Sequence, residues 1–232
     1  MRAATPISTT MAIRMADAAL LRLLAWLSPA FPTGGFAWSH GVEQAVEDGD
    51  ISDPASLLDW LEDVLRYGSG RTDAILLLHA HAAHSDRAAL AELAEFARAC
   101  QPSRERLAET LGQGNAFALA AAPWGAGVMA GIDDLPYPVA VGALAGAHGI
   151  DADAACAGFI QALAANMISA AMRLVPLGQS AGLRVLAGLE AAILAVAAEA
   201  RGASLDDAGS ACWRADLAAM RHETQYSRLF RS

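Results

Sequence analysis

The sequence predicts an all-α fold, a single-domain bundle of about nine to ten helices. Three observations lead to this prediction. Alanine and leucine, which favour helices, account for 56 and 29 of the 232 residues. Valine and isoleucine, which favour strands, together account for 18. The chain is 55% hydrophobic, so it can form a large core, and helix caps and breakers divide it into segments of helical length.

The N-terminal part of the chain begins with residues 1–16, which we expect to be a disordered leader because they lack a continuous apolar stretch. A first helix is expected over 17–27. It should end in Ser28–Gly35, a segment with two prolines and two glycines among eight residues. A second helix is expected over 36–47, ending before Gly49.

Helix-capping residues set the next boundaries. Asp53 followed by Pro54 is a strong start signal, because Asp is a preferred N-cap and Pro fits the first helical position. Gly68 should end that helix. Three further helices should each begin at a capping residue: 73–84 after Thr72, 86–100 after Ser85, and 103–121 from Ser103.

The C-terminal half contains the most apolar segments. Residues 123–138 are rich in Pro, Gly and Trp and should form a loop. Two long helices are expected over 151–175 and 180–201, and their apolar residues lie almost all round, as in central, buried helices. Ser204 and Asp207 have the spacing of a capping box for a last helix that ends near residue 220.

The chain has no lysine, and its 16 basic residues are all arginine. This excludes Schiff-base and pyridoxal-phosphate chemistry, the Walker A loop and Ser-x-x-Lys acyl enzymes. The net charge of −9 argues against nucleic acid as a partner. The 3 cysteines are far apart and fit a reducing, cytoplasmic compartment. Residues 154–172 are uncharged, but their polar and small side chains favour a buried helix over a membrane span.

Candidate chemical sites are weak. His79, His81 and His84 cannot chelate a metal together on one helix, and a solvated face is the simpler interpretation. Ser39 and His40 resemble a nucleophile elbow that lacks its strand. No set of acid, base and nucleophile assembles, so we expect no catalytic activity, no metal and no cofactor. A scaffold or partner-binding protein is favoured. The alternative is a helical small-molecule enzyme with a pocket between the two long apolar helices.

Three segments resemble the motifs of the urease accessory protein family UreF. They are Ser28–Glu43 (SPAFPTGGFAWSHGVE), Ala171–Gln179 (AMRLVPLGQ) and Arg221–Arg231 (RHETQYSRLFR). The last is the most specific of the three. Phe31, Ala37 and Val42 depart mildly from the pattern. The resemblance covers about residues 17–232, which implies a helical domain over 17–220 followed by a partner-binding tail over 221–232.

The resemblance also implies a function. Proteins of this family are helical, form homodimers and are not enzymes. They bind the accessory protein UreD, also called UreH, and the GTPase UreG. The assembly docks on apo-urease and supports GTP-dependent nickel insertion. A nucleotide-binding lysine and metal ligands would then belong to the partners.

The candidate partner-binding residues fall in the same three segments. The tail carries three arginines against one glutamate, while the rest of the chain is acidic, which suggests an interaction tail. We expect it to fold on binding as a helix that presents Tyr226, Leu229 and Phe230 on one face, and to add nothing to the core. The full set of candidates is Ser39, His40, Glu43, Arg173, Gln179, Arg221, His222, Glu223, Tyr226, Arg228, Leu229, Phe230 and Arg231.

Overall fold

The computed structural model describes residues 18–232, and the leader expected over 1–16 lies outside them. A first helix covers residues 18–26. The α-helices that follow are α2 (Val42–Glu47), α3 (Pro54–Tyr67), α4 (Ser69–Ala82), α5 (Arg87–Ala99), α6 (Arg104–Ala120), α7 (Tyr137–Ala147), α8 (Ala152–Leu174), α9 (Gln179–Gly188), α10 (Glu190–Ala200) and α11 (Trp213–His222). Short 3-10 helices lie at Gly35–Ala37, Ala122–Trp124, Ala126–Met129 and Leu205–Asp207. The described part contains no strand, which confirms the all-α class.

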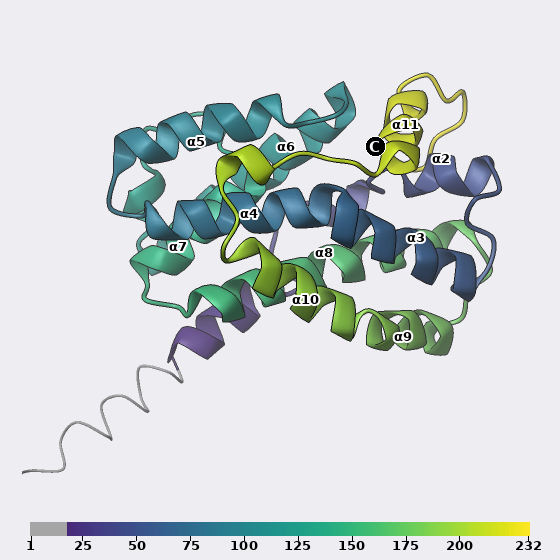
Figure 1. The fold of residues 1–232 in the computed structure, drawn as a ribbon, viewed down its shortest axis with the longest axis horizontal. Coiled ribbons are helices and arrows are strands. Elements are labelled where there is room, and N and C mark those ends of the chain that lie inside the picture. Colours follow the sequence, from purple (N-terminus) through teal and green to yellow (C-terminus); the bar gives the residue numbers. More distant parts are fainter. Residues whose placement is uncertain (1–17) are drawn as a thin grey trace, which may run out of the picture.

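Two helices form the centre of the bundle. α4 packs against α3, α5, α7, α8 and α10, and Ile75, Leu76 and Leu77 on it are fully buried. α8 crosses behind α4, with α5 and α6 on one side of the pair and α9 and α10 on the other (Figure 1). The prediction that the segment 151–175 forms a long central helix is therefore confirmed.

The helix α7 was not predicted, yet its contact with α4 is the most extensive between any two helices. Two glycines make it possible. A Cβ atom on Gly142 would lie 2.2 Å from the carbonyl oxygen of Leu77, and one on Gly146 would lie 2.4 Å from that of His81. Because glycine has low helix propensity, the sequence did not predict this helix. Here the two glycines let the backbones of α4 and α7 approach closely.

The capping predictions had mixed outcomes. Asp53 caps α3, with its Oδ1 accepting from the Ser56 amide at 2.8 Å, and Ser103 caps α6. The prediction for Thr72 is wrong, because α4 starts at Ser69 and the Thr72 hydroxyl donates back to the Gly68 carbonyl within the helix. The cap of α5 is Asp86, not Ser85, because the Asp86 carboxylate accepts two amide hydrogen bonds.

The second long apolar helix is not a single central helix. It breaks at Leu189 into α9 and α10, and Leu183 and Leu194 on its outer side are 66% and 64% exposed. By length and composition alone, Ala152–Leu174 and Gln179–Ala200 could each cross a membrane. Half of the most apolar window of α8 and 39% of that of Gln179–Ala200 are buried inside the protein.

The last helix begins later than predicted. The capping box of Ser204 and Asp207 is present, with the Ser204 amide donating to Asp207 Oδ2 at 2.8 Å. It closes only the 3-10 turn Leu205–Asp207. Gly209, with φ of 139°, then turns the chain, and α11 starts at Trp213.

Candidate partner-binding site

Residues 36–47 do not form the single helix that was predicted for them. Only Gly35–Ala37 forms a 3-10 turn, and α2 starts at Val42. Between them, His40 and Gly41 have φ of 62° and 80°. A Cβ on Gly41 would also lie 3.1 Å from the amide nitrogen of Ala219, so this position needs glycine both for its conformation and for the approach of α11.

The C-terminal segment lies along this turn. The Arg231 amide donates to the carbonyl of Ala37 at 2.9 Å, and the Ser39 amide donates to the carbonyl of Ser232 at 3.0 Å. The Ser39 hydroxyl also donates to that Ser232 carbonyl. These bonds join two parts of the chain that are nearly 200 residues apart in sequence.

The Glu43 carboxylate binds the backbone of the tail. Its Oε1 accepts from the Leu229 amide at 2.6 Å, and its Oε2 accepts from the Phe230 amide at 2.9 Å. The same Oε2 lies 3.1 Å from Nε2 of His222. Because Glu43 is only 6% exposed, its charge is compensated almost entirely by these groups.

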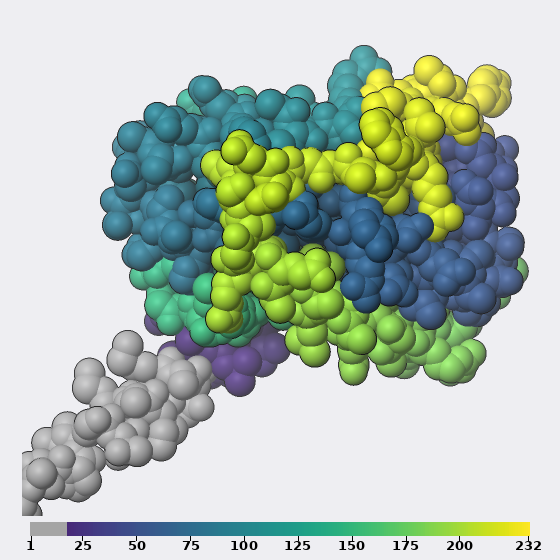
Figure 2. Space-filling view, in the orientation of Figure 1, coloured from purple at the N-terminus to yellow at the C-terminus, as the bar shows by residue number. Residues whose placement is uncertain are grey.

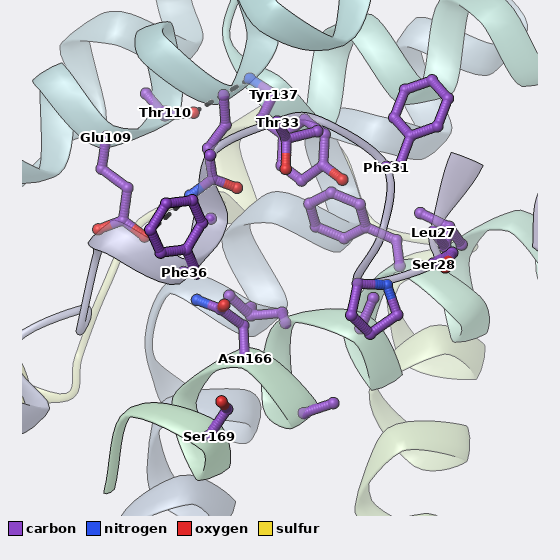
Figure 3. Close-up of a pocket in the computed structure, with 18 of the residues that line it drawn as sticks. Leu27, Ser28, Phe31, Thr33, Phe36, Glu109, Thr110, Tyr137, Asn166 and Ser169 are labelled. Carbon is purple, nitrogen blue, oxygen red and sulfur yellow. Dashed lines mark hydrogen bonds between the residues drawn. The ribbon is translucent and has the colours of Figure 1, made fainter. Parts of the chain in front are cut away.

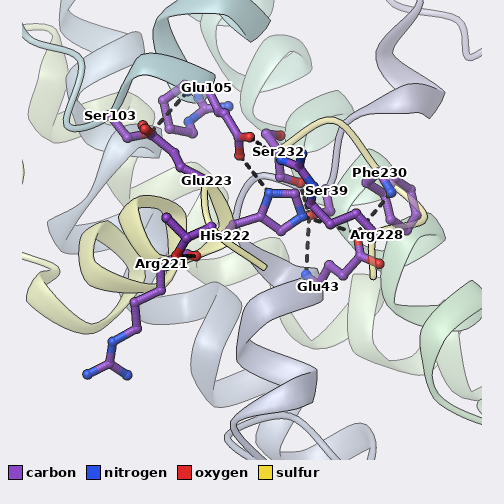
Figure 4. A network of polar contacts seen from close by, with 12 residues as sticks. Ser39, Glu43, Ser103, Glu105, Arg221, His222, Glu223, Arg228, Phe230 and Ser232 are labelled. Atoms are coloured by element: carbon purple, nitrogen blue, oxygen red, sulfur yellow. Dashed lines mark hydrogen bonds and ion pairs between the residues drawn. The ribbon is translucent and has the colours of Figure 1, made fainter. Parts of the chain in front are cut away.

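His222 is fully buried between two carboxylates. Its Nδ1 lies 2.6 Å from Oε2 of Glu105, while its Nε2 faces Glu43 (Figure 4). The second oxygen of Glu105 accepts from Arg228 at 2.7 Å. The network therefore ties α2, α6, α11 and the tail together through charge-assisted hydrogen bonds.

A second buried cluster lies beside this network. The Ser232 hydroxyl donates to Oε2 of Glu109 at 2.7 Å, and Nδ1 of His40 lies 3.4 Å from Oε1 of the same residue. Arg106 forms an ion pair with Glu109. Burial alone would raise the pKa of Glu109, but the Arg106 guanidinium and the Ser232 hydroxyl help to hold it at about 2. Burial, aided by Arg106, lowers the pKa of His40.

Two arginines pack on aromatic rings where the tail meets the turn. The guanidinium of Arg173 lies 4.1 Å from the centre of the Phe230 ring and donates to the carbonyl of Phe36 at 2.7 Å. The guanidinium of Arg231 lies 4.5 Å from the centre of the Trp38 ring. Both contacts are cation–π interactions, and they help to fix the end of the chain.

Exposed apolar side chains occur both on α11 and in the tail. On α11, Trp213, Leu217 and Met220 recur at helical spacing and are 74%, 47% and 46% exposed. Tyr226 and Leu229 of the tail are also exposed, Tyr226 completely. In Figure 2 this C-terminal segment lies at the outer edge of the molecule, beside α2. We call these five residues the C-terminal surface.

Comparisons with known proteins identify the family. The family model of UreF matches residues 51–190. The urease accessory protein UreF of Bradyrhizobium sp. strain BTAi1 is 52% identical over 224 residues, covering 92% of both chains. The UreF of Rhodopseudomonas palustris strain TIE-1 is 51% identical over 224 residues, covering 93% of both chains. The chain belongs to the UreF family of urease accessory proteins. The UreF of Rhizobium leguminosarum bv. viciae, 51% identical over 215 residues, covers 92% of this chain and aligns over 96% of its own.

The three segments that resemble UreF motifs meet at one place in this chain. The turn after residues 28–36 pairs with the end of the tail, and Arg173 of the second segment contacts both. The three segments are far apart in the sequence, so their contact could not be predicted from it. The third segment is therefore as much a part of the folded body as the first.

The structure separates the predicted partner-binding residues into three groups. Ser39, His40, Glu43, His222 and Phe230 are buried and bind within the chain. Arg173, Arg221, Glu223, Arg228 and Arg231 hold the tail through ion pairs or ring contacts while remaining at least partly accessible. Tyr226 and Leu229 are exposed, and Gln179, exposed at the start of α9, has no side-chain hydrogen bond among the described residues.

Two expectations about the tail need correction. Residues 223–232 are not helical, so Tyr226, Leu229 and Phe230 do not share a helical face. The tail is also not separate from the core, since Phe230 and Ser232 are 4% and 1% exposed. The reason is that the carboxylates of Glu43, Glu105 and Glu109, which lie far from the basic tail in the sequence, bind it in the fold.

A cavity of about 430 Å³ lies elsewhere in the chain. It is lined by the loop 28–36 and by residues of α4, α6, α7 and α8. No residue of α9 or α10 lines it, so this cavity is not the pocket expected between the two long apolar helices. Figure 3 shows Leu27 and Phe31 at one end and Glu109 at the other. Among residues 18–232, no group of three or more His, Cys, Asp and Glu residues could hold a metal ion.

Proposed function

We propose that this chain binds a UreD-type accessory protein, also called UreH, through its C-terminal surface, and that the resulting complex recruits the GTPase UreG. The assembly would dock on apo-urease and support GTP-dependent nickel insertion. Membership of the UreF family supports this proposal, because the relatives are named urease accessory proteins.

The C-terminal surface is the observation that carries the proposal. Its exposed members include Trp213 and Tyr226, and aromatic side chains are common anchors of protein interfaces. Arg221, Arg228 and Arg231 belong to the same segment and are exposed, so they can hydrogen-bond to carboxylates of a partner. The buried network beneath fixes the shape of this surface before binding, which reduces the entropic cost of association.

We further propose that the chain is a non-enzymatic homodimer of the cytoplasm. Leu20, Leu21 and Leu24 of the first described helix are 55%, 67% and 61% exposed, and Leu183 and Leu194 add apolar area on α9 and α10. Such area favours association between copies. Cys100, Cys156 and Cys212 are free thiols, in keeping with a reducing compartment.

Deletion of the gene in its host tests the proposed function. Urease activity and urease nickel content should both fall at least tenfold, with the amount of urease protein unchanged. Restoring the wild-type gene should restore both. Nickel-loaded urease in the deletion strain would contradict the proposal. A normal nickel content with low activity would also contradict it, because the defect would then lie after metal insertion.

A further inference from the structure

The cavity behind the loop 28–36 is built like a ligand site. Its volume, about 430 Å³, is within the range of small-molecule pockets. Leu27 and Phe31 lie at one end (Figure 3), and Phe159 also lines the cavity. The other end is polar. Glu109 lies there (Figure 3), and Asp73 and Arg106, which also line the cavity, are close enough for their charges to interact.

Asp73 is the group at the polar end that lacks a partner. It lies on α4, lines the cavity and is 7% exposed. Among the described residues its carboxylate has neither a hydrogen bond nor an ion pair within the usual distances. Burial raises its pKa to about 7 even though the positive charge of Arg106 acts in the opposite direction. A buried carboxylate without a partner is costly, so the site needs a hydrogen-bond donor.

The neighbouring charges do not supply that donor. Glu109 already accepts from Ser232 and Gln113 and pairs with Arg106. Arg106 also lines the cavity. Its guanidinium pairs with Glu109 and, among the described residues, forms no ion pair with Asp73, so the group of two carboxylates and one guanidinium carries an excess negative charge. That excess lies on the side chain that faces the cavity without a partner.

We propose that this cavity binds an organic cation, a primary ammonium or guanidinium group on a short aliphatic stem, with Asp73 as its counter-ion. The cation would supply the missing donor, and Phe31 and Phe159 would pack against the stem. The rings of Phe36 and Tyr137, which also line the cavity, can attract the positive charge. Binding of a free cation does not depend on the accessory function proposed above, whereas binding of a partner's side chain rests on it.

Other ligand classes fit the cavity less well. An anion would meet the uncompensated carboxylate. A neutral apolar ligand would leave Asp73 without a donor. A divalent metal ion needs several oxygen or nitrogen ligands, and Glu109, the nearest second carboxylate, is already engaged by Arg106 and Ser232.

The cation can come from a free small molecule or from an arginine or lysine side chain of a partner protein, and two measurements distinguish these sources. In the first, the full chain is titrated at pH 8 with n-butylguanidinium or n-butylammonium, with n-butylurea as the neutral comparator. In the second, the affinity of the chain for UreD-type and UreG-type proteins is measured. Both use Asp73→Asn and, as the matched control, Asp59→Asn, which removes an exposed carboxylate on α3.

We expect the two cations to bind one per chain with a Kd below about 1 mM, and Asp73→Asn to weaken binding at least tenfold, whereas Asp59→Asn leaves it unchanged. A tenfold loss of partner affinity in Asp73→Asn, without binding of the free cations, assigns the cation to a partner side chain. If neither measurement distinguishes Asp73→Asn from the control, the proposal is wrong. Equal binding of n-butylurea and n-butylguanidinium to the wild-type chain also overturns a site for the free cation, and this test needs no folded variant.

Discussion

Nε2 of His222 lies 3.1 Å from Oε2 of Glu43, and this buried contact joins the N-terminal motif to the end of α11. The same carboxylate accepts the amides of Leu229 and Phe230. Glu43 therefore organises the surface above it without being exposed itself. A residue of this kind affects partner binding through the position of the tail.

Glu43→Gln should lower the free energy of unfolding by about 2–3 kcal/mol, because the amide has one carbonyl oxygen where the carboxylate accepted with two. Urea unfolding followed by circular dichroism measures this change. Glu47→Gln, on the exposed side of the same helix, is the control and should stay within about 0.5 kcal/mol of the wild type. If the two substitutions lowered the free energy of unfolding by similar amounts, Glu43 would not be the residue that holds the tail in place.

Phe230→Ala should destabilise the chain by about 2–4 kcal/mol, because the ring is buried and lies under the guanidinium of Arg173. Tyr226→Ala should leave stability unchanged, since that side chain is fully exposed. Removal of residues 223–232 should lower the melting temperature as well. A truncated chain as stable as the full one would show that the tail contributes nothing to the core.

Gly142→Ala should cost about 1–3 kcal/mol, because the new methyl group would press against the carbonyl oxygen of Leu77 on α4. Gly127→Ala is the matched control, since a Cβ there meets no atom within 4 Å. Thermal unfolding of both variants checks the prediction. An unchanged melting temperature for Gly142→Ala would contradict the close contact of α4 and α7.

Asp73→Asn should stabilise the chain, and the gain should depend on pH. The folded chain raises the pKa of Asp73 from 3.8 to about 7, so the ionised form destabilises the fold. This destabilisation is complete above about pH 7 and is relieved as the pH falls towards 4. The advantage of the variant should therefore shrink by on the order of 2 kcal/mol between pH 8 and pH 5.

Melting temperatures of both proteins at pH 5 and pH 8 give this difference. His40, whose pKa is lowered, and Glu109, whose pKa is about 2, are present in both proteins, so their own titrations largely cancel. A variant that is less stable than the wild type at pH 8 would instead make Asp73 a structural counter-ion of Arg106.

The sequence predicted those helices whose signals are local. Asp53 and Ser103 cap helices because a short polar side chain next to free amides has one favourable partner. Thr72 failed as a cap because the same hydroxyl can donate to a carbonyl one turn back inside a helix. α7 was missed because Gly142 and Gly146 weaken the local preference, and only the packing against α4 explains them.

The sequence motifs select residues that the structure brings together, but they do not reveal the residues that these contact. Ser39, Glu43 and His222 were selected from the motifs, yet their partners Glu105 and Glu109 are ordinary charged residues on a helix in the sequence. Contacts between residues more than a hundred positions apart leave no periodic signal in one sequence. Burial of the tail therefore became evident only in the structure.

The affinity of the chain for a UreD-type protein tests the central proposal most directly. The double substitution Tyr226→Ala and Leu229→Ala removes two exposed side chains of the C-terminal surface and leaves the Glu43 network in place, because Glu43 binds the backbone amide of Leu229. Isothermal titration calorimetry should show at least a tenfold loss of affinity for the variant, at an unchanged melting temperature. An affinity within twofold of the wild type would show that the partner does not bind at the C-terminal surface.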